Sequence, residues 1–325
     1  MTGSARAPLV SVLMPVRDAL PYLDQALASL LGQTFRDFEL LLYDDGSRDG
    51  SRARLEACAA RDPRVRLVCG EPRGLSPWLR RGVREARGDF VARMDADDVA
   101  HPERLERQLA FLEAHPGCVA LGSEVLLVDP QGRPIRRGGV PLVHAEIESA
   151  LLRGRGEALP HPTAVFRRDA LRRAGSYRAD CATAQDLDLY LRLAEVGRLA
   201  NLPDVLLEWR QHLGKTSARK SGEQRRSAQA ILREAWRRRG LAPREEELPP
   251  ALPDAVAPRD HFRQWAEWAI GGRELATARV HARAVLCAEP LAWRSWQLYL
   301  RALAGLPAEP LRRARRALKG LREAA

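Results

Sequence analysis

The sequence lacks the long apolar runs, paired cysteines and N-terminal leader that mark membrane-spanning, disulfide-bonded and secreted proteins. No apolar run approaches the roughly 18 residues of a membrane-spanning helix. Residues 1–8 contain no apolar stretch of the kind found in a secretory signal. The five cysteines are odd in number and scattered, with no Cys-x-x-Cys pair and no Cys/His spacing typical of a zinc site. These absences predict a cytoplasmic protein with reduced thiols.

Two nucleotide-handling motifs and the recognisable nucleic-acid-binding modules are also missing. The Gly-x-Gly-x-x-Gly of dinucleotide dehydrogenases does not follow the first predicted strand. Residues 15–19 stand there instead, and they are not the Gly-rich basic loop of sugar-nucleotide-forming nucleotidyltransferases. The net charge of +11 would suit nucleic acid, but no aromatic-interleaved basic motif accompanies it. We therefore expect none of these three classes, and no nucleic-acid partner.

The N-terminal half contains strands that alternate with amphipathic helices. Strand-like runs at 9–16, 38–43, 65–69 and 89–94 are separated by helical patterns at 20–31, 51–60 and 77–86. This alternation predicts right-handed βαβ units, and hence an α/β fold with a mostly parallel, Rossmann-like sheet flanked by helices. With 325 residues, of which 45% are hydrophobic, the chain is long enough for about two domains.

Acidic residues cluster where two of these strands end. Asp44 and Asp45 close one strand, and Asp95, Asp97 and Asp98 follow another. Carboxylates crowded in this way repel each other unless a cation compensates them, and their oxygens suit Mg²⁺ or Mn²⁺. The carboxyl edge of an open α/β sheet is also where nucleotides bind. Two interpretations stay open, a metal-diphosphate site and a pair of solvated turns with helix-capping aspartates.

Motifs in a fixed order over residues 8–218 carry a family resemblance. They are the run 10–16, Asp44-Asp45-Gly46-Ser47, Gly74-Leu75, the segment 92–98, His161-Pro162-Thr163 and the segment 185–193. Together they resemble a family 2 glycosyltransferase of the bacterial polysaccharide type. The resemblance implies a GT-A fold and transfer of a sugar, with inversion, from a UDP- or dTDP-sugar to an acceptor hydroxyl. It also implies a bound Mn²⁺ or Mg²⁺, with UDP the favoured nucleotide.

The resemblance assigns a role to each candidate site residue. Asp186 would be the catalytic base, although an aspartate in the first turn of a helix is also favoured by the helix dipole. Nucleotide-binding residues would be Pro15, Val16, Asp44, Asp45, Arg73 and Asp95. Metal ligands would be Asp95, Asp97 and His212. The acceptor or diphosphate loop would use His161, Gln185, Arg210 and Lys215. Without the resemblance, the favoured interpretation of His212 and Lys215 is that they are ordinary polar residues of a loop.

Two departures from the family pattern leave a non-enzymatic alternative open. Gln185 stands where family members usually have Glu, and Arg80 stands where they often have Asn. The alternative is a catalytically degenerate GT-A domain that acts as a scaffold or binding protein. Arg93 lies two residues before Asp95 and shares its face of the strand, so we expect it to orient the acidic cluster through a charge-assisted bond.

The C-terminal part has a different composition and predicts a second, helical domain. Helical patterns at 259–271, 273–288, 291–304 and 309–323 follow a Pro- and Glu-rich stretch at 241–258. We expect a glycosyltransferase domain at 1–218 and a helical domain at 219–325. The last pattern, 309–323, combines a leucine face with six basic residues, which would suit an anionic membrane surface or a helix with solvated arginines. A lipid-linked or saccharide acceptor would agree with a peripheral location at the inner face of the membrane.

Overall fold

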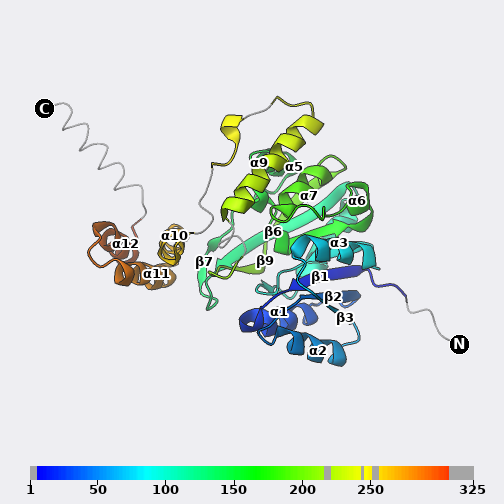
Figure 1. Cartoon of the computed structure of the whole chain (residues 1–325), viewed down its shortest axis with the longest axis horizontal. Coiled ribbons are helices and arrows are strands. Elements are labelled where there is room, and N and C mark those ends of the chain that lie inside the picture. The colour runs from blue at the N-terminus through cyan, green and yellow to red at the C-terminus, as the bar shows by residue number, and fades with distance from the viewer. Residues whose placement is uncertain (1–5, 216–220, 243–244, 251–255, 307–325) are drawn as a thin grey trace. The chain divides into compact units, whose positions relative to one another are not determined.

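A computed structural model describes residues 6–215, 221–242, 245–250 and 256–306, and its central feature is a mixed sheet (Figure 1). The sheet has nine strands in the order β3-β2-β1-β4-β8-β6-β9-β5, with β7 paired to β6. Its first four strands are β1 (Val10–Val16), β2 (Phe38–Asp45), β3 (Val65–Gly70) and β4 (Phe90–Arg93). These four pair in parallel, with Val16 opposite Asp44, which confirms the predicted βαβ arrangement.

The remaining strands make the sheet mixed. They are β5 (Val99–Ala100), β6 (Cys118–Val128), β7 (Pro134–Arg137), β8 (Val165–Arg167) and β9 (Arg198–Arg210). β8 pairs antiparallel with β4 and with β6, and β5 pairs antiparallel with β9. The antiparallel strands therefore start beside β4, the strand that leads into the acidic segment.

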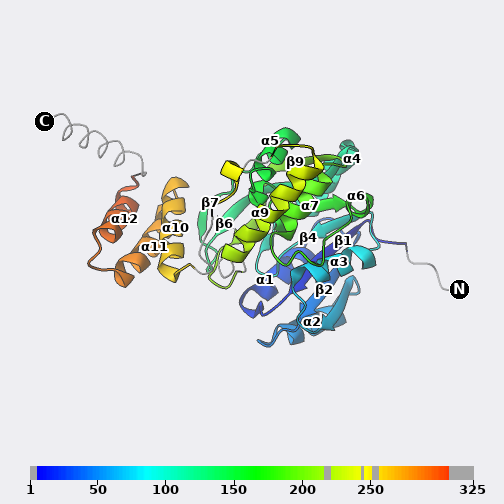
Figure 2. The ribbon, with the colours of Figure 1, turned by 45° about the horizontal axis from the view of Figure 1, so that its top comes forward.

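Helices cover both faces of the parallel part. They are α1 (Leu20–Leu31), α2 (Ser51–Arg61) and α3 (Leu75–Glu85). The turn after β2 contains Gly46, which has a φ of +73°, a backbone conformation that favours glycine. Because Gly46 has no Cβ, the ring of Pro72 can pack directly against the turn. On one face, Trp78, Leu79 and Val83 of α3 share a buried core with Leu13 of β1. Figures 1 and 2 show α3 on the opposite side of β1 and β2 from α1 and α2.

A second group of helices packs beside the antiparallel part. It comprises α4 (Arg104–Ala114), α5 (His144–Leu151), α6 (Arg168–Arg173), α7 (Gln185–Leu193) and α9 (Ser221–Arg238), with short 3-10 helices η1 (Gly156–Ala158), η2 (His161–Thr163) and η3 (Glu245–Glu247). α7 packs against both α5 and α9 (Figure 2). Leu187, Tyr190 and Leu191 of α7 are buried in the same core as Trp236 of α9. This packing fixes the helix that carries Asp186.

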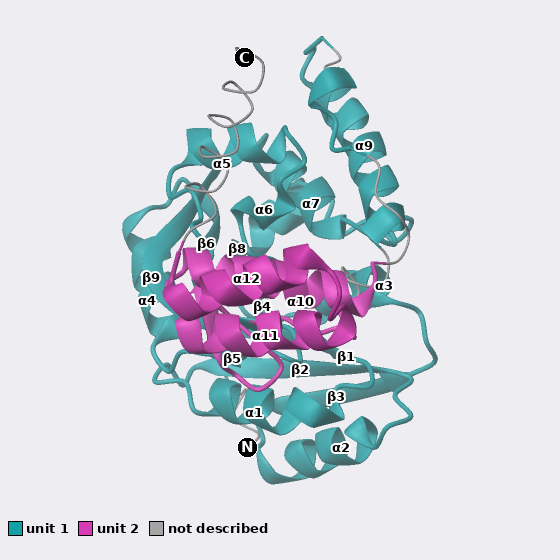
Figure 3. Ribbon diagram, turned by 90° about the vertical axis from the view of Figure 1, so that its left-hand side faces the viewer, with its two compact units in different colours: residues 1–125, 138–209, 220–253 teal, residues 126–137, 210–219, 254–325 magenta. Residues whose placement is uncertain are grey.

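The chain divides into two compact units (Figure 3). One consists of residues 1–125, 138–209 and 220–253, and the other of residues 126–137, 210–219 and 254–325. All the candidate residues from Pro15 to Asp186 belong to the first unit. The predicted domains, 1–218 and 219–325, are each one continuous stretch of sequence, and they stay a prediction.

Among its described residues, the second unit contains the helices α10 (Pro258–Gly271), α11 (Leu275–Ala288) and α12 (Trp293–Ala304). α10 also packs on β7, where the Arg136 guanidinium lies 5.1 Å from the Trp268 ring centroid. His281 of α11 places Nε2 3.1 Å from Oδ2 of the buried Asp129, in the turn between β6 and β7. The predicted helix at 309–323 lies outside the described residues. Within those that are described, no helix combines the length and the apolar character needed to cross a bilayer.

Candidate functional site

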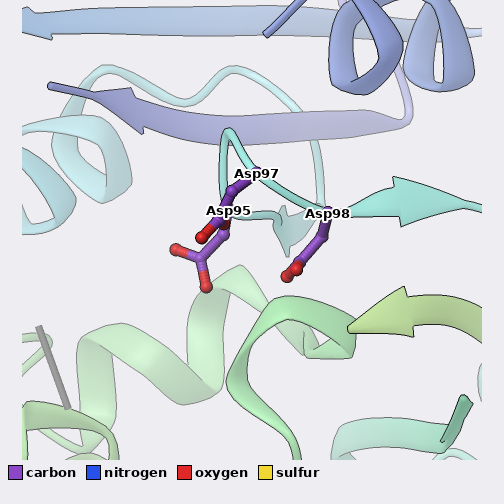
Figure 4. Close-up of side chains that lie close together, drawn as sticks. All are labelled: Asp95, Asp97 and Asp98. Atoms are coloured by element: carbon purple, nitrogen blue, oxygen red, sulfur yellow. The ribbon is translucent and has the colours of Figure 1, made fainter. Parts of the chain in front are cut away.

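The acidic residues Asp95, Asp97 and Asp98 lie on the loop between β4 and β5, and Figure 4 shows their side chains leaving it toward one side. One carboxylate oxygen from each lies within 4.8 Å of the others. Asp98 is fully buried, whereas Asp95 and Asp97 are partly exposed. Three oxygens converging in this way fit a hard divalent cation, which takes carboxylate ligands and keeps several waters. The residues present therefore suit the Mn²⁺ or Mg²⁺ that the resemblance implies.

Two buried arginines compensate part of this negative charge. Arg93, at the end of β4, is 3% exposed and donates two hydrogen bonds to the Asp95 carboxylate, one of them 2.6 Å long. This confirms the predicted orienting role of Arg93. Arg104, the first residue of α4, is fully buried and donates through Nη2 to the Arg93 carbonyl oxygen at 2.7 Å. Burial and the neighbouring Arg93 charge lower the pKa of Arg104 to about 9, so it stays cationic at neutral pH.

Asp44, at the end of β2, builds the turn that follows it. Its Oδ1 accepts a hydrogen bond from the Ser47 backbone at 3.1 Å. Its Oδ2 accepts one from Arg52 Nε at 2.8 Å, and the residue is fully buried. The carboxylate therefore joins β2 to the start of α2.

Asp45, the next residue, organises the segment that contains Arg73. Asp45 Oδ1 accepts from the Arg73 backbone at 2.5 Å and from Trp78 Nε1 at 2.7 Å. The Gly74 backbone donates to both oxygens, at 3.1 and 3.2 Å. The Arg73 guanidinium lies 6.0 Å from the Trp78 ring centroid. Pro15 and Val16, at the end of β1, pair in register with Tyr43 and Asp44, so these nucleotide-binding candidates meet at one edge of the sheet.

Asp186 lies in the first turn of α7, directly after the buried Gln185. Its Oδ1 accepts a hydrogen bond from the Leu187 backbone at 2.9 Å. Burial raises the pKa of Asp186, while the Leu187 N–H group and the positive charge of Arg93 oppose that increase. Tyr190, one helical turn later, is fully buried, and its hydroxyl has no hydrogen-bond partner among the described residues. A carboxylate with a raised pKa suits a general base.

His161 lies beside the same arginine, at the start of η2. Its Nε2 is 2.8 Å from the Tyr177 hydroxyl, and both side chains are buried. Burial, and to a lesser degree the Arg93 charge, hold the pKa of His161 well below its usual value. His161 is therefore a neutral residue that forms a hydrogen bond with Tyr177.

The remaining candidates, Arg210, His212 and Lys215, belong to the second unit. Arg210 is 3% exposed and donates through Nη1 to the carbonyl oxygens of Asp129 and Pro130, at 3.3 and 3.2 Å. In the second unit, Arg210 therefore stabilises the turn between β6 and β7.

Sequence reasoning missed Arg104, Trp78 and Tyr177. Arg104 did carry a signal, because a cation in the first turn of a helix is disfavoured by the dipole and so suggests a nearby anion. Trp78 carried none, since a tryptophan in an amphipathic helix indicates only core packing. Tyr177 lies in a loop whose contacts with η2 depend on the tertiary fold.

Comparisons with known proteins agree with this geometry. A family model described as "Glycosyl transferase family 2" matches residues 11–175. The putative glycosyltransferase EpsE of Bacillus subtilis is 33% identical over 209 residues, 63% of this chain and 73% of EpsE. The amylovoran biosynthesis glycosyltransferase AmsE of Erwinia amylovora is 36% identical over 194 residues, 58% of this chain and 70% of AmsE.

Solved structures share the fold at low sequence identity. Mannosyltransferase PcManGT from Pyrobaculum calidifontis, in complex with GDP-Man and Mn²⁺, has a TM-score of 0.53 at 20% identity and covers 95% of this chain and 83% of its own. S. aureus TarS 1–349 in complex with UDP-GlcNAc has a TM-score of 0.53 at 18% identity, covering 90% and 79%. The match over half of its length, the relatives and the shared fold show that this chain belongs to glycosyl transferase family 2, adopts a GT-A fold and is a glycosyltransferase.

Proposed function

We propose that the protein transfers a sugar from a UDP- or dTDP-sugar to an acceptor hydroxyl, with inversion, in the synthesis of a cell-surface polysaccharide or glycolipid. The observation that carries the proposal is the convergence of Asp95, Asp97 and Asp98 within 4.8 Å at the carboxyl end of β4. Relatives with polysaccharide names, such as AmsE, support the acceptor class. The UDP-GlcNAc in the solved TarS complex supports a UDP-sugar as the donor.

Asp95 and Asp97 would hold Mn²⁺ or Mg²⁺, with His212 as a further candidate ligand. When bound, the metal would neutralise charge that grows on the departing nucleoside diphosphate. Asp98 is fully buried, and we assign it to the support of the loop. Arg210 and Lys215 stay candidates for contacts with the diphosphate.

The nucleoside would lie against the loops that Asp44 and Asp45 build. Pro15 and Val16 would contact it from the end of β1, and Arg73 from the segment that Asp45 holds. A carboxylate can accept the imide N–H of uracil or thymine. Each of the two carboxylates already accepts N–H groups of the protein, so either one would have to share or exchange a donor, and both stay candidates for that contact.

Asp186 would take the proton of the acceptor hydroxyl. The acceptor oxygen then forms a bond to the anomeric carbon while the bond from that carbon to the diphosphate oxygen breaks, so the nucleoside diphosphate leaves with the electron pair. Burial raises the pKa of Asp186, and the higher pKa makes its carboxylate a stronger base. His161 and Gln185 would form the wall of the acceptor site.

The acceptor would be a saccharide or a lipid-linked saccharide. We include a peripheral, cytoplasmic location at an anionic membrane surface in the proposal, on the basis of the net charge of +11 and the basic pattern at 309–323.

Calorimetric titration with UDP and dTDP, each with and without Mn²⁺, tests the donor half of the proposal. We expect tight binding of one nucleotide only when Mn²⁺ is present. Binding of neither nucleotide under any condition would refute it. Asp186→Asn tests the other half, because it should abolish most turnover while the Mn²⁺-dependent binding of the nucleotide persists.

A further inference from the structure

Arg93 pairs with the carboxylate of Asp95, which the proposed function assigns to the metal ion. Its guanidinium makes two hydrogen bonds to the two Asp95 oxygens, and the arginine side chain is 3% exposed while the Asp95 side chain is 30% exposed. A bidentate pair between a guanidinium and a carboxylate uses the same two carboxylate oxygens that would ligate a cation. The pair and a metal therefore compete for one carboxylate.

The two buried arginines offset most of the negative charge of the cluster without a metal. Asp95, Asp97 and Asp98 contribute three negative charges, and Arg93 and Arg104 contribute two positive charges. Both arginines are buried, so water screens their charges little. The loop is thus held together before any cation arrives.

A displaced Arg93 would remain a buried cation in need of an anion. Its Nε already lacks a hydrogen-bond partner among the described residues. A buried guanidinium left without an acceptor is strongly unfavourable. Displacement of Arg93 by a metal alone is therefore costly, whereas a ligand that brings its own anionic oxygens would offset that cost.

We propose that Arg93 is a resting counter-ion of Asp95 that disfavours binding of the metal alone and favours joint binding of metal and nucleoside diphosphate. The inference rests on the proposed function, because it assigns Asp95 to the metal. In the resting site Arg93 neutralises Asp95. In the loaded site the cation takes the Asp95 carboxylate, and oxygens of the diphosphate accept the freed N–H groups. Arg93 is a positioning residue in this scheme.

The test measures Mn²⁺ affinity without nucleotide, from the free-Mn²⁺ signal in electron paramagnetic resonance. Arg93→Met keeps the length and apolar stem of the side chain but removes its charge. We expect R93M to bind Mn²⁺ about 10-fold or more tightly than the wild type, because the metal no longer competes with a charge-assisted pair. We also expect UDP to strengthen Mn²⁺ binding less in R93M than in the wild type, since the two ligands lose part of their coupling.

Two further variants make the result decisive. Arg168→Met is the matched control, because Arg168 pairs with Asp89 at the opposite end of β4 and its loss changes the net charge equally. R168M should bind Mn²⁺ within about twofold of the wild type, since distant charges are screened. Arg93→Lys keeps the positive charge but cannot make the bidentate contact with Asp95. Its Mn²⁺ affinity should therefore lie between those of the wild type and R93M.

A folded R93M that binds Mn²⁺ no more tightly than the wild type would overturn the inference. If thermal unfolding shows that R93M does not fold, R93K decides in its place, and an affinity equal to that of the wild type rejects the inference. Loss of the buried positive charge by itself also favours a bound cation, so the result specific to the competition is the higher Mn²⁺ affinity of R93K, which keeps that charge. Failure of the proposed function looks different, because the wild type would then bind no Mn²⁺ even with UDP or dTDP.

Discussion

Replacement of Trp78 by phenylalanine should destabilise the carboxyl edge of the parallel strands. Trp78 Nε1 donates to Asp45 Oδ1 at 2.7 Å inside the core, and a buried bond to a charged acceptor contributes about 1.5–3 kcal/mol. The ring also lies against β3, where a Cβ on Gly70 would be 2.7 Å from Trp78 Cη2. A smaller ring leaves a cavity there that costs about 1 kcal/mol more. We expect the free energy of unfolding to fall by roughly 2–4 kcal/mol.

Urea denaturation gives that free energy, and calorimetry with UDP and Mn²⁺ gives the consequence for binding. Tyr43→Phe is the matched control, because Tyr43 packs 5.4 Å from the Trp78 ring but hydrogen-bonds Glu85 instead of Asp45. Y43F should lose about 0.5–1.5 kcal/mol of stability and keep nucleotide affinity. W78F should lose affinity as well, because Asp45 then holds the Arg73 segment less firmly. The reasoning is refuted if Y43F proves the more damaging change, or if W78F binds nucleotide as the wild type does.

Three further predictions concern Asp186 and Asp129. Asp186→Asn should reduce kcat at least about 100-fold, as expected for a lost general base, with little change in nucleotide affinity measured by calorimetry. Because burial raises the pKa of Asp186, kcat/KM should begin to decrease at a pH above 3.8 as the pH is lowered. A kcat/KM that stays constant down to pH 3.8 would contradict the assignment of Asp186 as the general base. Asp129 has its pKa lowered to about 2, since its hydrogen bonds with His281 and Arg133 outweigh its burial. The contribution of the Asp129 carboxylate to stability should be complete above the ordinary pKa of 3.8 and should vanish as pH falls through 2. Asp129→Asn should therefore be less stable than the wild type at about pH 6, and the two should become similar near pH 2. Denaturation monitored by tryptophan fluorescence measures both stabilities.

The parallel part of the fold was predictable because each element has a regular local pattern. The helix predicted at 20–31 is α1, Leu20–Leu31, and the strand predicted at 38–43 is β2, which extends two residues further to Asp45. The antiparallel strands were not predicted. β6 is buried along almost its whole length, so it shows no alternation of apolar and polar residues. Its partner β8 has only three residues, too few for a pattern.

The candidate site was predictable in its types of residue and less so in its contacts. Asp45 had two interpretations, a turn residue and a contact for a nucleobase, and a carboxylate that accepts three N–H groups is compatible with both. Arg93 was identified because a period of two places it on the face of Asp95. Arg104 is eleven residues from Arg93, and only the tertiary fold brings its guanidinium to the Arg93 carbonyl.

The paired arginines beneath the acidic loop also affect how the protein matures. In a small zinc domain, binding of the metal supplies the free energy of folding, so a chelator unfolds the chain. Here Arg93 and Arg104 already balance two of the three carboxylates, and Gln108 connects Arg104 to η2 through a hydrogen bond to the Thr163 carbonyl oxygen at 2.8 Å. The enzyme should therefore be synthesised and stored intact when manganese is scarce. On the proposed metal dependence, a chelator should inhibit it reversibly, and restored metal supply should return activity without new protein synthesis.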